Sequence, residues 1–432
     1  MFTADCLSVN ERGHLTIGGC DTVELAKTYG TPLYVMSEEQ IRKTCRMYRD
    51  SIEEYYHGRG LVCYASKAFC CKEMHRIIKE EGLGIDVVSG GELYTAMQVD
   101  FPPEKIQFHG NNKSEEELRM ALSYNVGHFV VDNKSELAAL DRMAEEMGKV
   151  ADVSLRIKPG IDAHTHQFIM TGQIDSKFGF ALETGEALEA VKAAVTYPHI
   201  RLKGLHNHIG SQIFDVKPFV AAAEVMMDFI AQIKKETGIV IEDLNLGGGF
   251  GIKYLTTDEP VPYSDYMKEI SGAIFRKCAE HDLDVPYIYM EPGRSIAGEA
   301  GITLYTVGAV KEIPDIRTYV SVDGGMCDNP RYILYQSDYT VLCANRADQP
   351  ADTKITVAGK CCESGDLIQE HTMVQKTEVG DTLAVLSTGA YNYSMASHYN
   401  RNPKPAVVMV KDGEARVVIK RETFADLTRN DV

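Results

Sequence analysis

The residues of this chain that could do chemistry stand at the ends of short apolar runs. Lys67 closes the run Leu-Val-Cys-Tyr-Ala-Ser-Lys that begins at Leu61. A lone lysine at a strand end is usually a solvated surface group, so its position alone indicates little. Other runs end in Gly, His, Asp, Glu or Arg. Together these residue types are suited to hold a phosphorylated cofactor and an amino-acid substrate.

Two of these run ends carry groups that could bind an anion. Residues 247–251, Gly-Gly-Gly-Phe-Gly, let backbone N–H groups close around an anion with no Cβ in the way. Residues 291–294, Glu-Pro-Gly-Arg, add a guanidinium suited to phosphate or carboxylate. A glycine cluster by itself is more often a tight turn. Because the two segments follow the seventh and eighth runs, a barrel formed by these runs would favour the phosphate interpretation.

A His-x-His pair follows the sixth run. On a strand, His206 and His208 would point to the same face. The plain interpretation is a buried histidine satisfied by the backbone, and the alternative is a zinc pair like those at barrel strand ends in some hydrolases. The metal interpretation has no clear further ligand set and uses neither Lys67 nor the glycine loop. We therefore expect no metal and keep a metal hydrolase as an alternative.

The runs themselves are mostly apolar rather than alternating, which is typical of parallel strands covered by helices. Helical stretches lie between most of them, and two begin with an N-cap candidate followed by acids. Eight such units in about 230 residues predict a (β/α)8 barrel, with a doubly wound open sheet as the alternative. The predicted strands are residues 61–65, 85–88, 105–108, 128–131, 153–157, 202–205, 243–246 and 287–290, and the predicted helices include 114–123, 135–147, 216–237 and 264–281.

A second domain follows the barrel. Alternating segments with turn signals from about residue 302 predict an antiparallel β domain, and Leu15–Ile17 is expected to add an N-terminal strand to it. We therefore predict an N-terminal segment (1–32) that joins the β domain, a cofactor-binding barrel (33–295) and a C-terminal β domain (296–432). The β segments are residues 303–310, 318–322, 354–358, 382–387 and 406–411.

Composition narrows the class of protein. The chain has 11 cysteines without metal-ligand spacing, no signal peptide and no apolar run of membrane length, so we expect a reduced cytosolic protein. The formal net charge of −17 argues against nucleic acid and anionic membranes as partners. A hydrophobic content of 44% is ample for two cores.

The motifs together resemble the fold type III pyridoxal-phosphate enzymes, the alanine racemase-like group, and among these most closely the diaminopimelate decarboxylases. The resemblance extends from about residue 32 to residue 399. Any one motif could occur by chance, but their shared order could not. The motifs are Tyr64-Ala65-Ser66-Lys67-Ala68, Asp175-Ser176-Lys177-Phe178-Gly179, His208-Ile209-Gly210-Ser211-Gln212, the glycine loop, Glu291-Pro292-Gly293-Arg294, Cys362-Glu363-Ser364-Gly365-Asp366 and Gly389-Ala390-Tyr391.

The resemblance implies pyridoxal 5'-phosphate as cofactor, bound to Lys67 as a Schiff base, with His208 stacked on its ring. Glu291 would face the ring nitrogen, where a carboxylate keeps the nitrogen protonated and the ring a better electron sink. The further cofactor-binding residues that the family implies are Ser211, Gly248, Gly249, Gly293, Arg294 and Tyr391.

The implied reaction is decarboxylation through an external aldimine and a quinonoid carbanion. Cys362 matches the family's proton donor, which reaches the active site of the partner subunit, so the resemblance implies a homodimer with shared sites. The unperturbed pKa of a cysteine thiol is about 8.5, and it shifts readily with the surroundings of the thiol. A buried structural thiol is the alternative interpretation of Cys362.

Substrate choice depends on the far end of the amino acid. By the resemblance, Arg294, Arg331, Tyr335 and Glu363 bind the distal carboxylate and ammonium of meso-2,6-diaminopimelate, which is converted to L-lysine and CO2 in the last step of lysine biosynthesis. Tyr391 completes the cofactor and substrate contacts in the family, with a half-buried aromatic of the β domain as the alternative interpretation. An arginine pair disfavours substrates with a cationic far end.

Two further interpretations stay open. One is a decarboxylase of the same fold that acts on ornithine, arginine or carboxynorspermidine, and the other is a non-catalytic pyridoxal-phosphate carrier, which would be a barrel without a β domain. The sequence assigns no role to Asp86, Lys177, His206 or Cys361.

Overall fold

The chain forms two compact units in a computed structural model that describes residues 2–161 and 176–432. The barrel unit comprises residues 44–251 and 260–293, and the β unit comprises residues 1–43, 252–259 and 294–432. Residues 33–43, which we expected in the barrel, thus belong to the β unit. Within the described residues, no helix is both long and apolar enough to cross a membrane.

Eight parallel strands of the described barrel unit close into a barrel, because β8 pairs with both β7 and β9. The eight predicted strands are all confirmed, and closure excludes the open doubly wound sheet. The two-residue β10 (Phe180–Ala181) also pairs with β9. In order around the barrel the strands are β9 (Ala151–Lys158), β11 (Ile200–His206), β12 (Asp243–Asn245), β13 (Tyr287–Met290), β5 (Gly60–Ala65), β6 (Gly84–Val87), β7 (Ile106–Phe108) and β8 (His128–Val131).

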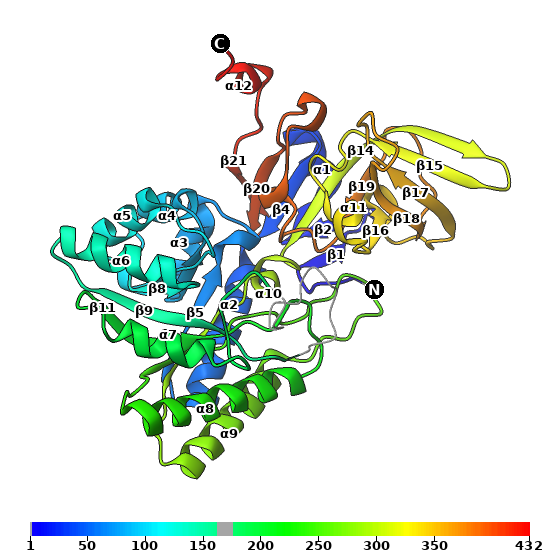
Figure 1. Ribbon diagram of the computed structural model, residues 1–432. Helices are drawn as coiled ribbons and strands as arrows, with labels where there is room; N and C mark the ends of the chain where they lie inside the picture. Colours follow the sequence, from blue (N-terminus) through cyan, green and yellow to red (C-terminus); the bar gives the residue numbers. More distant parts are fainter. Residues whose placement is uncertain (1, 162–175) are drawn as a thin grey trace. The chain divides into compact units, whose positions relative to one another are not determined.

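Helices surround these strands (Figure 1). The start of α5 is encoded locally, because the Ser114 hydroxyl accepts the Glu117 N–H while the Glu117 carboxylate accepts the Ser114 N–H. Asn133, rather than the predicted Ser135, caps α6, since its side-chain oxygen accepts the Glu136 N–H. The helices between β4 (Leu33–Ser37) and the last barrel strand are α2 (Glu38–Tyr56), α3 (Lys72–Glu80), α4 (Gly90–Met97), α5 (Glu115–Tyr124), α6 (Lys134–Glu146), α7 (Glu186–Ala194), α8 (Lys217–Thr237) and α9 (Tyr263–His281).

The interior of the barrel is polar. His128 on β8 contacts Asp243 on β12 at 3.0 Å, and Asn245 on β12 donates to Gln107 on β7 at 3.1 Å. These strands are not neighbours in the barrel, so the side chains meet across its interior. Branched aliphatic residues usually fill this space. Buried polar groups there need partners, which makes the arrangement specific.

The β unit contains a mixed nine-stranded sheet. All five predicted segments form strands, but the pairs β4–β20 and β15–β17 are parallel, so the sheet is not purely antiparallel. A parallel pair requires a long crossover, and the whole barrel separates β4 from β20 in the chain. The strands are β4 (Leu33–Ser37), β14 (Gly301–Ile313), β15 (Arg317–Val322), β16 (Val341–Cys343), β17 (Thr353–Ala358), β18 (Leu367–Val374), β19 (Thr382–Val385), β20 (Ala406–Lys411) and β21 (Glu414–Ile419).

The N-terminal strand of that sheet is β4, rather than the expected Leu15–Ile17. Leu15–Ile17 is β2 of a separate three-stranded sheet with β1 (Leu7–Val9) and β3 (Cys20–Asp21). Glycines with positive φ flank β2, and the turns that they form restrict β2 to antiparallel pairing with its neighbours in the chain. Helix α1 (Thr22–Tyr29) packs with this sheet on one core of the unit. Two short helices, α10 (Arg294–Ala297) and α11 (Arg331–Tyr335), and the C-terminal α12 (Phe424–Thr428) complete it.

Candidate active site

Lys67 lies on a short 3-10 helix, Ser66–Ala68, directly after β5. Its neighbours Ser66 and Ala68 are buried, whereas the lysine side chain is exposed. The Ser66 hydroxyl is 3.0 Å from Nε2 of buried His75, and the Tyr64 hydroxyl donates to the carbonyl of Phe69. The turn is therefore anchored on both sides, and it presents the amine at the C-terminal end of the barrel strands, where barrel enzymes carry their chemistry.

Glu291 follows β13 and is buried under a set of hydrogen-bond donors. Its Oε1 is 2.7 Å from His109 Nε2 and 2.6 Å from Asn245 Nδ2, and its Oε2 is 3.1 Å from His206 Nε2. The donors come from β11, β12 and the end of β7. His206 has no role assigned from the sequence, and His109 and Asn245 are not among the predicted residues. Asn245 stands on β12 and His109 directly follows β7, each in phase with the inward-facing residues of its strand.

These contacts determine the charges in the cluster. Burial opposes the ionised form of Glu291, but the two histidines and their hydrogen bonds hold the pKa of Glu291 well below its usual range. Burial lowers the pKa of His206 to about 3 and also lowers the pKa of His109. At neutral pH the cluster is thus one carboxylate held by two neutral imidazoles, each of which donates through Nε2.

The glycine loop lies against the segment that carries His208. A Cβ on Gly248 would come within 2.1 Å of the Glu291 carbonyl oxygen, and one on Gly249, at φ +114°, within 2.3 Å of the Gly210 carbonyl oxygen. The Gly248 N–H is 3.4 Å from His208 Nδ1. Burial and the nearby cations Lys67 and Arg156 keep the pKa of His208 well below its usual value, so its imidazole is neutral.

Asp86 and Arg156 add a second buried pair of titratable groups. Burial and the Glu291 carboxylate raise the pKa of Asp86 well above its usual range, while Lys67 acts in the opposite direction. Cζ of Arg156, a residue that is not among those predicted from the sequence, lies 4.2 Å from the Phe178 ring centroid. Phe178 and Lys177 belong to the predicted 175–179 motif, of which Asp175 lies outside the described residues.

In the β unit, two guanidiniums surround one tyrosine. The Cζ atoms of Arg294 and Arg331 lie 4.8 Å and 5.5 Å from the ring centroid of Tyr391. Arg294 also donates to the Tyr254 hydroxyl at 2.5 Å, and Arg331 Cζ lies 5.1 Å from the Tyr335 ring. Cation–π contacts hold such groups in place without neutralising them. The predicted Arg294, Arg331, Tyr335 and Tyr391 are therefore brought together, and the arrangement suits an anion.

The loop that carries Cys362 and Glu363 is organised by buried Asp366. The Asp366 carboxylate accepts the N–H groups of Met326 and Cys361, both at 2.6 Å. Cys362 and Glu363 are exposed on this loop. Across the described chain, no ion pair joins Glu363 to Arg331, and the Glu363 carboxylate accepts the Gly365 N–H instead.

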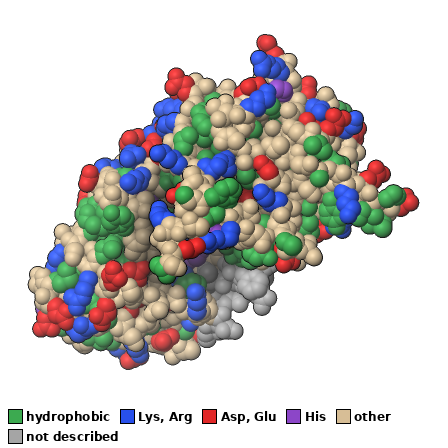
Figure 2. Space-filling view, turned by 90° about the horizontal axis from the view of Figure 1, so that it is seen from above, with side chains coloured by type: hydrophobic (Ala, Val, Ile, Leu, Met, Phe, Trp, Pro, Cys, Tyr) green, Lys and Arg blue, Asp and Glu red, His purple; other side chains and the backbone are tan. Residues whose placement is uncertain are grey.

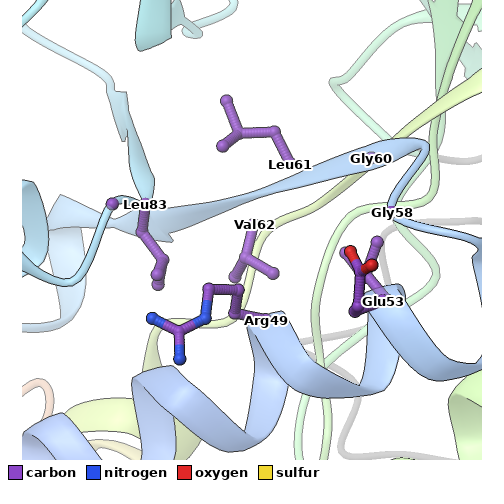
Figure 3. Close-up of a pocket in the computed structure, with 9 residues that line it drawn as sticks. Arg49, Glu53, Gly58, Gly60, Leu61, Val62 and Leu83 are labelled. Carbon is purple, nitrogen blue, oxygen red and sulfur yellow. The ribbon is translucent and has the colours of Figure 1, made fainter.

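Two hollows of the barrel unit lie away from these residues. A cavity of about 150 Å³ is lined by Arg49 and Glu53 of α2 and by the start of β5 (Figure 3). A wider one of about 760 Å³ is lined by residues that include His128, Asp243 and Tyr287. Both border the N-terminal ends of barrel strands, opposite to the ends that carry Lys67 and Glu291.

Comparison with known proteins decides the family. The family profile described as pyridoxal-dependent decarboxylase, pyridoxal binding domain, matches residues 38–298. The chain belongs to the pyridoxal-dependent decarboxylases. The cofactor of this decarboxylase is therefore pyridoxal phosphate.

Relatives and solved structures match the whole chain. A diaminopimelate decarboxylase of Bacillus subtilis is 49% identical over 435 residues, covering 100% of this chain and 98% of that protein. The crystal structure of a diaminopimelate decarboxylase from M. jannaschii in co-complex with L-lysine has a TM-score of 0.92 at 36% identity, covering 100% and 99% of the two chains. A lysine/ornithine decarboxylase from Vibrio vulnificus shares the fold, with a TM-score of 0.77 at 21% identity and coverage of 90% and 98%.

The residues of the barrel unit fit this cofactor. Glycine is required at positions 248 and 249 because neighbouring backbone oxygens occupy the place of a Cβ. A loop of glycines can also offer its N–H groups to a phosphate without interference from side chains. Glu291 is ionised and can accept a hydrogen bond from a protonated ring nitrogen. Neutral His208 can stack on an aromatic ring, and the Lys67 amine is accessible.

Proposed function

We propose that this decarboxylase converts meso-2,6-diaminopimelate to L-lysine and carbon dioxide, as the final step of lysine biosynthesis. The observation that carries the proposal is the pair of guanidiniums around Tyr391. One end of the substrate is an ordinary amino acid, and the other carries a second carboxylate that suits an arginine. A diamino acid with a bare ammonium at its far end would face the same cations without compensation.

The roles of the cofactor-binding side chains follow from their chemistry. In the barrel unit, we assign Lys67 to covalent attachment of the cofactor and Glu291 to its ring nitrogen, with His208 stacked on the ring. When bound, the cofactor supplies an electron sink for the carbanion that remains after loss of carbon dioxide. The phosphate is assigned to Ser211, Gly248, Gly249, Gly293 and, in the β unit, Arg294, while Tyr391 is assigned to cofactor and substrate contacts.

The remaining substrate contacts come from the β unit. We assign Arg331 and Arg294 to the distal carboxylate, because a guanidinium fork matches a carboxylate in geometry and charge. Glu363 is assigned to the distal ammonium, since it is an exposed carboxylate on the loop that organises around Asp366. Gly365 of this loop packs on Ile333, within the helix that carries Arg331. Tyr335 lies at the end of that helix.

We assign proton donation to Cys362 of a partner subunit. Its side chain is exposed, and its N–H donates to the Asn400 side chain at 2.8 Å, which anchors the backbone while the thiol stays accessible. The working unit is then a homodimer with shared sites, and an isolated protomer lacks a proton donor. On the face seen in Figure 2, basic and acidic side chains are interspersed, which suits a small-molecule substrate better than nucleic acid.

The test is carbon dioxide and lysine production from meso-diaminopimelate by the cofactor-loaded protein, with parallel reactions on ornithine, arginine, lysine and carboxynorspermidine. Turnover of diaminopimelate alone supports the proposal. Turnover of another substrate instead would keep the fold and Lys67 but overturn the assignment of Arg331 and Glu363. Turnover of none, with cofactor bound, would favour a non-catalytic carrier.

A further inference from the structure

We propose that Asn245 is a positioning residue that couples the carboxylate facing the cofactor ring to the loop that binds the cofactor phosphate. Its side chain makes three hydrogen bonds inside the barrel. Nδ2 donates to Glu291 Oε1 at 2.6 Å and to Gln107 Oε1 at 3.1 Å, while Oδ1 accepts the Gly247 N–H at 2.9 Å. Gly247 opens the glycine loop, so one amide contacts both halves of the proposed cofactor site.

The orientation of this amide follows from its partners. The Gly247 N–H can only donate, so the atom that faces it must be the oxygen of Asn245, and the nitrogen must face Glu291. An ionised carboxylate needs a donor at that place, and the amide provides one. Gln107 is then oriented in turn, because only its oxygen can accept from Asn245. Its Nε2 is left buried without a partner in the described chain.

Asn245 acts on Glu291 as well as on the loop. Glu291 Oε1 receives only two of these hydrogen bonds, from His109 and Asn245, and burial otherwise opposes its charge. Loss of a hydrogen bond to a buried charged group leaves that charge less stabilised. Because Asn245 is 1% exposed, water cannot readily replace its amide. The Glu291 N–H donates to the Gly247 carbonyl at 2.7 Å, so Asn245 adds a side-chain link to a backbone contact that already joins these two residues.

The two functions can be separated by substitution. Asn245→Ala removes both contacts, so kcat should fall about tenfold to a hundredfold, and the cofactor dissociation constant should rise by a similar factor. Asn245→Asp keeps an oxygen for the Gly247 N–H. Its carboxyl can donate to Glu291 only while protonated, and burial beside Glu291 raises its pKa.

Asn245→Asp should therefore bind the cofactor nearly as well as the wild type. As the pH rises and the new carboxyl ionises, kcat should fall while KM changes little, and the absorbance of the bound cofactor should change with the same apparent pKa. Gln107→Met removes an acceptor but leaves both main contacts, so a decrease in kcat below about threefold is expected. Asn125→Asp, at the exposed C-cap of α5, is the matched control and should behave as the wild type.

The experiment measures cofactor affinity by titration, the absorbance of the loaded enzyme across pH, and kcat and KM for diaminopimelate. Equal losses in Asn245→Ala and Asn245→Asp, without a new pH dependence in absorbance, would overturn the inference and leave a purely structural role. If Asn245→Ala does not fold, Asn245→Ser, which leaves a smaller cavity, replaces it. The inference rests on the proposed function only for the turnover measurements, so a failure of that function leaves affinity and absorbance to decide it.

Discussion

Replacement of Arg331 by alanine should raise KM for meso-diaminopimelate far more than it lowers kcat. Arg331 is 7% exposed, and its guanidinium is held by the rings of Tyr335 and Tyr391. Nη2 donates to the Ser337 hydroxyl at 3.2 Å, and Nε has no partner among the described residues. Several of the five N–H donors of the fork thus remain for a substrate carboxylate.

The size of the effect follows from these donors. A hydrogen bond to a charged group contributes about 1.5–3 kcal/mol, and a carboxylate can take two from one guanidinium. The second arginine of the cluster, Arg294, compensates in part, so we expect a loss of about 2–4 kcal/mol. KM should then rise by about 30-fold to 1,000-fold. Arg331→Lys keeps the charge but loses the planar fork, so its KM should be intermediate.

The assay is steady-state release of carbon dioxide, with folding checked by thermal denaturation. Arg12→Ala is the control, because Arg12 is an arginine of the same unit whose ion pair with Glu24 is exposed at both ends. Such a pair contributes at most about 1 kcal/mol, so KM should not change. An unchanged KM in folded Arg331→Ala, or an equal rise in Arg12→Ala, would refute the assignment of Arg331 to the distal carboxylate.

Three further predictions concern the scaffold. Gly248→Ala should abolish cofactor binding in a titration, since its Cβ would lie 2.1 Å from a backbone oxygen. The matched control, Gly272→Ala, places its Cβ in open space inside α9 and should stabilise the protein by about 0.5–1 kcal/mol. Glu136→Gln should lower the free energy of urea unfolding by about 3–5 kcal/mol, because it removes the negative charge that lies 2.6 Å from the buried ammonium of Lys113. A decrease below about 1 kcal/mol would contradict this. Burial lowers the pKa of His75 to about 4 in the folded protein, whereas the pKa of a histidine in the unfolded chain is about 6.5. The contribution of neutral His75 to the free energy of unfolding is therefore complete above about pH 6.5 and falls by about 2 kcal/mol by pH 5. His75→Gln should reduce this acid sensitivity in urea titrations at pH 7 and 5, and an unchanged difference between the two pH values would argue against a neutral buried imidazole.

Local patterns in the sequence were sufficient to place the barrel strands and many of their helices. Apolar runs of β-forming residues identify buried strands wherever they fold, and the Ser114 capping box depends on residues only three positions apart. The order of the runs also located Lys67 and the glycine loop at the C-terminal strand ends. In contrast, the strand that joins the large sheet was misplaced to Leu15–Ile17, because pairing of β4 with β14 and β20 joins segments hundreds of residues apart.

The electrostatics of the site depended on the tertiary structure. Glu291 is an evident candidate in the sequence, but its charge is stabilised by His109, His206 and Asn245, which come from three other places in the chain. Likewise, no local pattern brings Arg331 to the ring of Tyr391. Spacing along the chain specifies which residues share a strand face, whereas the pKa of a buried group depends on every charge and donor that folding packs around it. The sequence therefore determined which residues could do chemistry, and only the closed barrel and the folded β unit decided which of them are neutral, charged or held in place.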